Sequence, residues 1–571
     1  MQAGRPTGFT ALGFTVVRRG RTEYAPTTET TAADRGDPRE TGARMSERPL
    51  EPTRRDLLAG LGTAGGGALA GCSTTLGTGP SPTFRVGTLR PPITLDPIEA
   101  RSIGSEQAIG RVFDGLYEYG EGTDVVPAIA AGEPAFGTDR REVTVEIDER
   151  ARFQNGRDVV AEDVVYSFEA PLETDAPTAW RVEPFDSVTA VDERTIRFSL
   201  EEPYPGLDYA LTHPIVPRQE REDDREAFAT EPIGAGPFEV TSFSAEKKAT
   251  LSRWGDYWGD PVPEIARLTM AYVEFPMTQL TSLRTNRNDA IEPVSPLIVD
   301  HVSDVANASV KRRQGYTSFY FGFNLNQGPT TDPRVREAIS YCMDLEKAVA
   351  DFVAPMGRRQ YSPLPPQVAD DWDMPTDEWA DLANETNPET ARQLFREADA
   401  ASGQLRILTS TDPKHKEFGE ALAGGLRDAS RGALVVSKPE SSFLETVVSG
   451  SARDYSVFVG EIVGTPDPDS HLYPTFHENM AGVTNGTFYR EDAVMERLMA
   501  ARETEDRERR RRLYEAAITR LLEDRVCLPI CSFENSFAVD AGVRNFRVHP
   551  IAGVNPRLAA GADIVTMETE P

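Results

Sequence analysis

The alternation of apolar and polar residues predicts strands in several separate parts of the chain. Apolar side chains occupy every second position of 142–147 and of 194–200, as in strands that bury one face. The run 526–533 is apolar almost throughout, which is typical of a strand buried on both faces. Further strands are expected at 84–87, 239–243 and 319–326.

Helical patterns occur between these strands, so the chain is expected to have an α/β fold. In 105–117 apolar residues recur at helical intervals. Asp332 followed by Pro333 is typical of an N-cap and the first helical position. Further helices are expected from Ala161 onwards, over 389–400 and over 491–523. The last of these is rich in arginine at 507–512, and we expect these charges to face solvent.

A signal-like segment precedes this pattern. Arg54 and Arg55 are followed by a Gly- and Ala-rich apolar run, and Leu69-Ala70-Gly71-Cys72 resembles a lipobox. Paired arginines, a short apolar segment and small residues at its end are typical of a twin-arginine lipoprotein signal. The alternative is a Gly-rich linker that contains a cysteine by chance. We expect a signal over 45–71, a lipid on Cys72 and an anchoring linker over 72–83.

Residues 1–44 resemble neither a signal nor a folded segment, so we expect translation to start at Met45 and 1–44 to be absent from the mature protein. About 500 residues remain after 1–71 are set aside. This length is too great for one hydrophobic core and sufficient for two or three lobes.

The composition is strongly acidic, with 91 Asp and Glu against 61 Lys and Arg and a formal charge of −30. Such a charge repels nucleic acid, so no nucleic-acid partner is expected. An acidic, lysine-poor surface resembles that of haloarchaeal proteins, in which concentrated salt screens the repulsion. We therefore interpret the charge as an adaptation to the solvent.

Three cysteines follow Cys72, and all are expected to be small core residues. Cys527 and Cys531 lie four positions apart in a predicted strand, roughly 13 Å at strand rise, which is too far for a disulfide. Neither a second cysteine pair nor a nearby histidine completes a zinc site around them. No apolar stretch after Cys72 has the ~18 residues that a membrane helix needs.

Several short motifs then occur in a characteristic order. They are Leu95-Asp96-Pro97, Phe113 to Tyr117, Phe153 to Gly156 with Ala161 to Val164, Gly234 to Phe238, Tyr257-Trp258, Phe323-Asn324 and Arg334 to Ala338. In this order they resemble the family 5 extracellular solute-binding proteins of peptide-type ABC importers, over about residues 82–571. The resemblance implies an α/β, two-lobed, periplasmic-binding-protein-like clamp with mixed sheets.

The resemblance also implies how the clamp is assembled. Lobe I would combine 82–125, 236–318 and 528–571, an inserted domain would cover 126–235, and lobe II would cover 319–527. Two chain crossings would form the hinge, with Tyr316 and Phe321 in one and Cys527 in the other.

Two edges between the lobes would hold the ligand. One edge is Arg101, Ser102 and Ile103; the other is Gly460, Glu461, Ile462, Gly464 and Asp467. Peptide-binding members resemble Trp-x-x-Asp-Tyr-x-Asp-Pro at the second edge, where the first Asp accepts the α-ammonium of the peptide. Here Gly464 stands at that Asp position and Glu461 at the Trp position. Glu461 either supplies a replacement charge or faces solvent, and Arg101 either pairs with a ligand carboxylate or lies on the surface.

The implied function is capture of a peptide or peptide-like solute and its delivery to ABC permease subunits with their ATPase. We expect a monomer without a cofactor, exported by the twin-arginine route and held on the outer face of the cytoplasmic membrane through Cys72. His471 and His477 leave open a nickel-chelate or other non-peptide receptor. A receptor that feeds a signalling partner and a secreted hydrolase are further alternatives, although no Gly-x-Ser-x-Gly or His-Glu-x-x-His motif supports the hydrolase.

Overall fold

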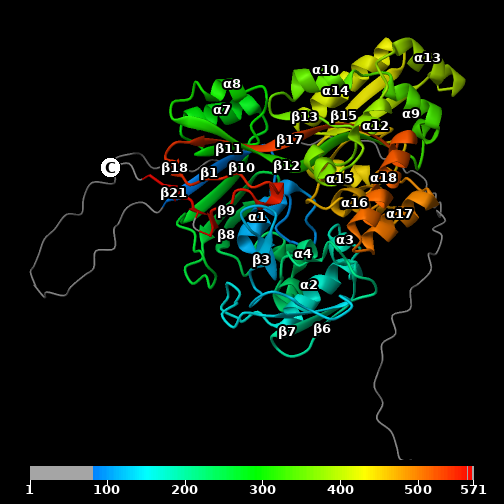
Figure 1. Cartoon of the computed structure of the whole chain (residues 1–571). Coiled ribbons are helices and arrows are strands. Elements are labelled where there is room, and N and C mark those ends of the chain that lie inside the picture. Colours follow the sequence, from blue (N-terminus) through cyan, green and yellow to red (C-terminus); the bar gives the residue numbers. More distant parts are fainter. Residues whose placement is uncertain (1–81, 401, 562, 569–571) are drawn as a thin grey trace, which may run out of the picture. The chain divides into compact units, whose positions relative to one another are not determined.

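Two long antiparallel strands, β12 (Ala308–Phe323) and β17 (Cys527–Asp540), form the centre of the main sheet. The first half of β12 pairs with the last half of β17, and the second half of β12 with the first half of β17. Strands β16, β14 and β15 follow on the side of β12, and β11, β1, β10, β9 and β8 follow on the side of β17. The pair is therefore common to both halves of the sheet (Figure 1).

The computed structural model describes residues 82–400, 402–561 and 563–568. The predicted signal at Arg54 and Arg55 and the predicted lipid on Cys72 lie outside the described residues and stay predictions. No helix in the described ranges is long and apolar enough to cross a membrane.

Lobe I is the part of the sheet beyond β17. Its strands are β11 (Ala290–Glu292), β1 (Thr83–Thr88), β10 (Arg267–Tyr272), β9 (Lys248–Arg253) and β8 (Phe238–Ser244). Its helices are α1 (Ile103–Val112), α7 (Pro276–Arg284) and α8 (Val299–Val302). Strand β1 is parallel to β10 and β11, whereas β8 and β9 are antiparallel, so the sheet is mixed. Apolar side chains of β1, α1 and the C-terminal segment form one core.

Lobe II is the part of the sheet beyond β12, and helices cover both of its faces. Its strands are β16 (Val457–Val463), β14 (Gln404–Ser410) and β15 (Gly432–Lys438). One core contains α9 (Pro333–Ser340), α10 (Leu345–Phe352), α13 (Pro388–Glu397) and α14 (Pro413–Asp428). The other contains α11 (Pro366–Asp371), α12 (Thr376–Asp381), α15 (Glu440–Val447), α16 (Asp469–Phe476), α17 (Asp492–Arg502) and α18 (Arg507–Glu523). Phe321 and Tyr320 of β12 enter different cores, because successive side chains of a strand point to opposite faces.

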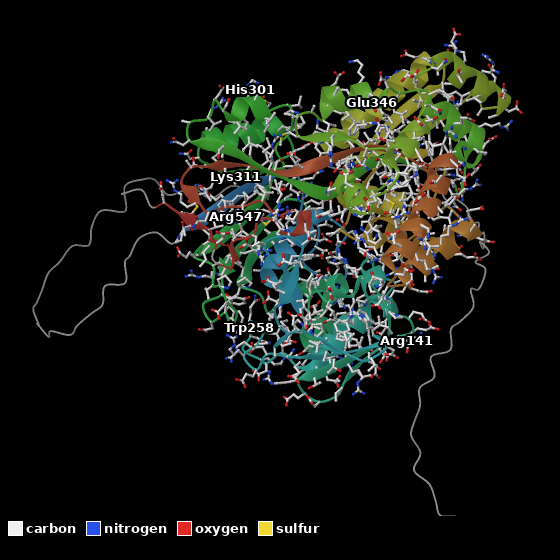
Figure 2. All side chains as sticks on the ribbon, viewed as in Figure 1. Arg141, Trp258, His301, Lys311, Glu346 and Arg547 are labelled. Atoms are coloured by element: carbon white, nitrogen blue, oxygen red, sulfur yellow. The ribbon has the colours of Figure 1, made fainter. Side chains whose placement is uncertain are left out.

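The inserted domain has its own four-stranded antiparallel sheet, in the order β4-β5-β7-β6. These strands are β4 (Ala135–Phe136), β5 (Glu142–Glu146), β7 (Thr195–Leu200) and β6 (Phe185–Ala190). Its helices are α2 (Ala161–Glu173), α3 (Ala179–Val182), α4 (Leu207–Ala210), α5 (Arg218–Asp223) and α6 (Arg225–Phe228). In Figure 2, the labelled Arg141 marks this domain at the bottom of the view, and Glu346 marks the outer helices of lobe II at the top.

Motifs that are distant in the sequence join the inserted domain to lobe I. The Gln154 side-chain amide donates to the carbonyl of Gly236 (3.1 Å), and its oxygen accepts from the Gly234 N–H (3.0 Å). A Cβ at Gly234 would lie 2.0 Å from the Val112 carbonyl oxygen, so only glycine allows this approach. The Gln-Asn-Gly and Gly-Ala-Gly motifs are therefore structural connectors.

A buried ion pair makes a second connection. Asp96 of the Leu-Asp-Pro motif accepts hydrogen bonds of 3.1 and 2.9 Å, through its two carboxylate oxygens, from Nε of Arg221 in α5. Arg221 is 0% exposed and also donates to the Tyr166 hydroxyl (2.9 Å). Both charges lie in the interior, where each depends on the other.

The predicted strands and most predicted helices are confirmed. The helix expected over 105–117 instead spans Ile103–Val112, because Phe113 has extended backbone angles. The helix expected over 491–523 is two helices, α17 and α18, separated at 503–506. Cys342, Cys527 and Cys531 are buried and free, as expected.

The expectation that the arginines of 507–512 face solvent is wrong for Arg510. Its side chain is 5% exposed and forms an ion pair with Asp467 across the second core of lobe II. In a run of charged residues on an exposed helix, about one position per turn faces inward. Arg510 occupies such a position, and its partner Asp467 lies 43 residues away in the sequence.

The strand pair also locates the chain crossings between the lobes. Its register is irregular between Gln314 and Thr317, and Tyr316 falls in this irregularity. Phe321 and Cys527 lie in the half that belongs to lobe II, next to a second irregularity between Phe319 and Tyr320. The hinge and the predicted domain boundaries stay predictions.

Replacing Asp96 by alanine should lower the free energy of unfolding by about 3 kcal/mol, because the Arg221 guanidinium would stay buried without its carboxylate. Denaturant unfolding measures this change. The matched control is Glu222→Ala, which removes the exposed partner of Arg218 and should have little effect. Equal effects of the two substitutions would contradict the assigned role of the buried pair.

Candidate functional site

Two cavities lie between lobe I and lobe II, and the inserted domain lines the large one as well. The large cavity has a volume of about 240 Å³ and is lined by α1, by Trp180 and Tyr204 of the inserted domain, and by 463–470 of lobe II. The small cavity has a volume of about 80 Å³ and is lined by the start of α1, by Glu461 of β16 and by Glu440 of α15. Residues of α1 and of β16 line both cavities, and the two together are called the cleft.

The segment after β16 brings two carboxylates to the large cavity, and each has an arginine beside it. Asp467 receives hydrogen bonds of 2.9 and 2.7 Å from the two terminal nitrogens of Arg510, a bidentate pair. Asp469 accepts from the Tyr204 hydroxyl (2.9 Å) and lies 3.6 Å from Nε of Arg502, while its Oδ1 has no hydrogen-bond partner among the described residues. Asp467 is therefore the more completely paired of the two.

Arg502 of α17 also connects lobe II to the inserted domain. Its guanidinium donates to the Trp180 carbonyl (2.5 Å), lies 3.6 Å from the Glu183 carboxylate and stacks on the Tyr473 ring at 3.7 Å from its centroid. The Tyr473 hydroxyl donates to the same Glu183. This cluster closes one end of the large cavity with contacts between two separately folded parts.

The small cavity contains an incompletely paired carboxylate. The Glu461 side chain is 23% exposed, and its nearest cation is Arg90 at 3.6 Å. Oε1 of Glu461 is buried and has no hydrogen-bond partner among the described residues. Glu461 is therefore partly buried, and one of its carboxylate oxygens is shielded from solvent.

The surroundings of Glu461 favour its protonated form. Burial raises the pKa of Glu461 to about 7, an increase that Arg90 opposes and Asp412 reinforces. Burial and the charge of Glu461 likewise raise the pKa of Glu440 to about 8. A cation placed between these carboxylates would stabilise the charged form of both.

The other predicted residues of the two edges occupy different places. Ser102 caps α1 by accepting from the Ser105 N–H (3.2 Å), and Ser102 and Ile103 line the small cavity. Arg101 is exposed and lines neither cavity. Gly460 and Ile462 are buried in β16, where Gly460 packs against Tyr320.

Gly464 lines the large cavity, and its environment explains the missing carboxylate. A Cβ at Gly464 would lie 2.4 Å from Cε1 of His471. His471 is 0% exposed, and its Nε2 lies 2.9 Å from the Thr465 carbonyl oxygen. An aspartate at 464 would therefore have to displace a buried ring.

The two histidines of this region are packed in the interior. Burial lowers the pKa of His471 and of His477 to about 4. His477 stacks on Tyr473 and accepts from the Asn479 N–H (3.2 Å). Within the described ranges, no three His, Cys, Asp or Glu side chains are grouped so that they could hold a metal ion.

Sequence reasoning missed several residues of the cleft. Arg111, Trp180, Tyr204 and Arg557 line the large cavity, and Arg90 faces Glu461 in the small one. Arg111 could have been recognised from the sequence, because it is a charged residue that interrupts the apolar face of a predicted helix. The remaining four lie in segments without a recognisable pattern.

Comparison with known proteins places this architecture in a family. The family model described as bacterial extracellular solute-binding proteins, family 5 Middle, matches residues 124–482. The chain belongs to this family. As a family 5 protein it is the solute-binding component of an ABC importer and a binding protein rather than an enzyme, which confirms both expectations.

Individual proteins of other organisms are similar to this chain along most of their length. Protein XP55 of Streptomyces lividans is 26% identical over 75% of this chain and 80% of its own length. The glutathione-binding protein GsiB of Salmonella typhi is 22% identical over 81% of this chain and 91% of its own length.

Solved structures confirm the α/β periplasmic-binding-protein fold. The periplasmic binding protein DppA of Helicobacter pylori, in complex with the peptide STSA, has a TM-score of 0.76 at 19% identity and covers 85% of this chain and 98% of its own. NikZ of Campylobacter jejuni, in complex with Ni(L-His), has a TM-score of 0.71 at 20% identity and covers 83% and 98%. At these identities the likeness concerns the fold alone.

The raised pKa of Glu461 leads to a test of stability against pH. An unfolded glutamate has a pKa of about 4.5 and the folded one about 7, so the folded protein binds more protons between these values. Wild-type stability should therefore fall relative to Glu461→Gln as pH rises through this window, by about 2–3 kcal/mol in total.

Denaturant unfolding from about pH 4.5 to about pH 8 measures this difference. The control is Glu445→Gln, an exposed glutamate of α15. Its free energy of unfolding should change with pH in parallel with that of the wild type. If the free energy of unfolding of Glu461→Gln also changed in parallel, burial would not destabilise the charged form of Glu461.

Proposed function

We propose that this protein captures a peptide or peptide-like solute in the cleft formed by the two cavities and presents it to an ABC permease. The observation that carries the proposal is the composition of the cleft, which all three parts of the fold line together. A ligand there would contact both lobes and would favour their closed arrangement.

Backbone edges in the cleft support an extended ligand. Strand β16 ends at Val463, and its last residues pass from the small cavity to the large one. The residues just before and at the start of α1, from Ser102 to Gly104, face the small cavity from lobe I. An extended chain between such edges could use main-chain hydrogen bonds, which tolerate varied side chains.

Glu461 is the proposed acceptor for a cationic group of the ligand. Its buried Oε1 has no hydrogen-bond partner among the described residues, and Arg90 reaches it only at 3.6 Å. An ammonium group in the small cavity would supply the missing donors. Glu461 would thus replace, from a different position, the carboxylate that is absent at Gly464.

The tethering of the receptor belongs to the same proposal. A lipid on Cys72 would hold the binding protein beside its permease after export, with 72–83 as a flexible spacer. A nickel chelate is a less favoured ligand, because His471 and His477 are packed in the interior.

Peptides should raise the thermal stability of the purified full-length chain in concentrated salt. A ligand present at tens of Kd stabilises the folded protein by about 2 kcal/mol. The screen compares short peptides with sugars and nickel–histidine chelates. Stabilisation by a chelate or a sugar alone would contradict the proposed ligand class, and turnover of a peptide would contradict a pure binding role.

Glu461→Gln should weaken binding of a stabilising peptide about tenfold or more, since a neutral amide replaces the partner of its ammonium. Isothermal titration calorimetry measures the change, and Glu445→Gln is again the control. An unchanged Kd would remove Glu461 from the binding site.

A further inference from the structure

Arg111 is a buried cation that lacks a partner of opposite charge. It lies in the last turn of α1, lines the large cavity and is 9% exposed. Its one hydrogen bond runs from Nη1 to the Pro556 carbonyl (2.9 Å), and its Nε has no partner in the described part of the chain. A buried guanidinium without a carboxylate is costly for the folded protein.

The other arginines of the large cavity are paired. Arg181 forms an ion pair with Glu106 (2.6 Å), and Arg557 forms one with Glu118 (3.1 Å). Burial and the nearby Arg557 lower the pKa of Arg111 to about 10, against the opposing charges of Glu118 and Asp114, so Arg111 stays protonated at neutral pH. Among the arginines that line the large cavity, Arg111 is the one that forms no ion pair with a described carboxylate.

The two acids whose charges act on Arg111 have other partners. Asp114 accepts from the Tyr257 hydroxyl (3.1 Å), and burial together with Glu118 raises its pKa to about 7. Glu118 forms its ion pair with Arg557.

The two incompletely paired side chains line different cavities, Arg111 the large one and Glu461 the small one. Ile103 of the small cavity and Arg111 of the large one are eight residues apart on α1, about 12 Å at helical rise. Glu461 and Gly464, which line the same two cavities, are three residues apart, about 10 Å at strand rise. An extended tripeptide spans about 10 Å.

We infer that Arg111 binds the carboxylate of a zwitterionic ligand whose ammonium lies at Glu461. This inference deepens the proposed function and rests on it. It gives the ligand a direction, because the position at which related receptors hold the ammonium is Gly464, in the cavity of Arg111. The large cavity then lacks the acid at 464 that would hold an ammonium group and has Arg111 to hold a carboxylate. The two ends of the ligand are therefore exchanged relative to those receptors.

The test uses three equimolar mixtures of tripeptides of uncharged residues: with free termini, with amidated C-termini and with acetylated N-termini. Native mass spectrometry of the full-length chain identifies bound members, and calorimetry gives their Kd. The wild type should prefer the free form over the amide by at least about 30-fold, equivalent to about 2 kcal/mol. Arg111→Met should remove this preference, and Arg111→Lys should keep most of it.

Arg181→Met is the matched control, because it removes a paired arginine from the same cavity. It should change the affinity for free and amidated peptides by the same factor. If Arg111→Met does not fold, the inference is still tested by the ratio of the affinities of the wild type for free and amidated peptides, and by the same ratio for Arg111→Lys.

The outcomes separate the two proposals. If the wild type binds peptides but does not distinguish the amide, or if Arg111→Met keeps the preference, the role of Arg111 is wrong while peptide capture stands. If the wild type binds none of the mixtures, peptide capture is wrong and the role of Arg111 is overturned with it.

Discussion

The antiparallel pair of β12 and β17 is the constraint on which the rest of the structure depends. Lobe I is attached to β17 and lobe II to β12, so neither half of the main sheet is complete without a strand that continues into the other. Each strand supplies backbone groups to both halves, and the pairing is irregular at two places, between Gln314 and Thr317 and between Phe319 and Tyr320. A ladder of this kind restricts relative movement of the lobes to bending and twisting about a short segment. The cleft opens beside it, between elements that the ladder does not join.

The inserted domain contributes Trp180, Arg181 and Tyr204 to the lining of the large cavity. It is joined to lobe I by the buried pair of Asp96 and Arg221, by the amide of Gln154 and by apolar side chains such as Phe228, which belongs to the core of lobe I. Its contacts with lobe II are polar, notably those of Tyr204 with Asp469 and of Arg502 with Glu183. Polar contacts between separately folded parts exchange readily with water, whereas apolar packing does not. The apolar junction with lobe I therefore suits a permanent connection, and the polar contacts with lobe II suit one that forms on closure.

Much of the fold could be predicted from the sequence, because strands and helices follow from local patterns. The alternation in 142–147, the apolar run at 526–533 and the Asp332 cap all give elements where they were expected. The motifs predicted the family, yet several of their residues prove to be structural, such as Gln154 and Asn324. The site was harder to predict, since its charges are paired over long separations. Arg510 meets Asp467 and Arg221 meets Asp96 only after the chain has folded, and no local pattern records these partners.

Charge pairing also identifies the residues of the cleft that interact with something outside the chain. Several charges that line it form ion pairs of 3.1 Å or less within the fold, including those of Asp467, Arg181 and Arg557. Interior charges without a partner cost stability, and selection for stability alone would remove them. Arg111 and Glu461 retain polar atoms without hydrogen-bond partners among the described residues, one in each cavity. Their opposite signs match those of the two termini of a peptide, and a ligand that supplied both partners at once would favour closure of the lobes around it.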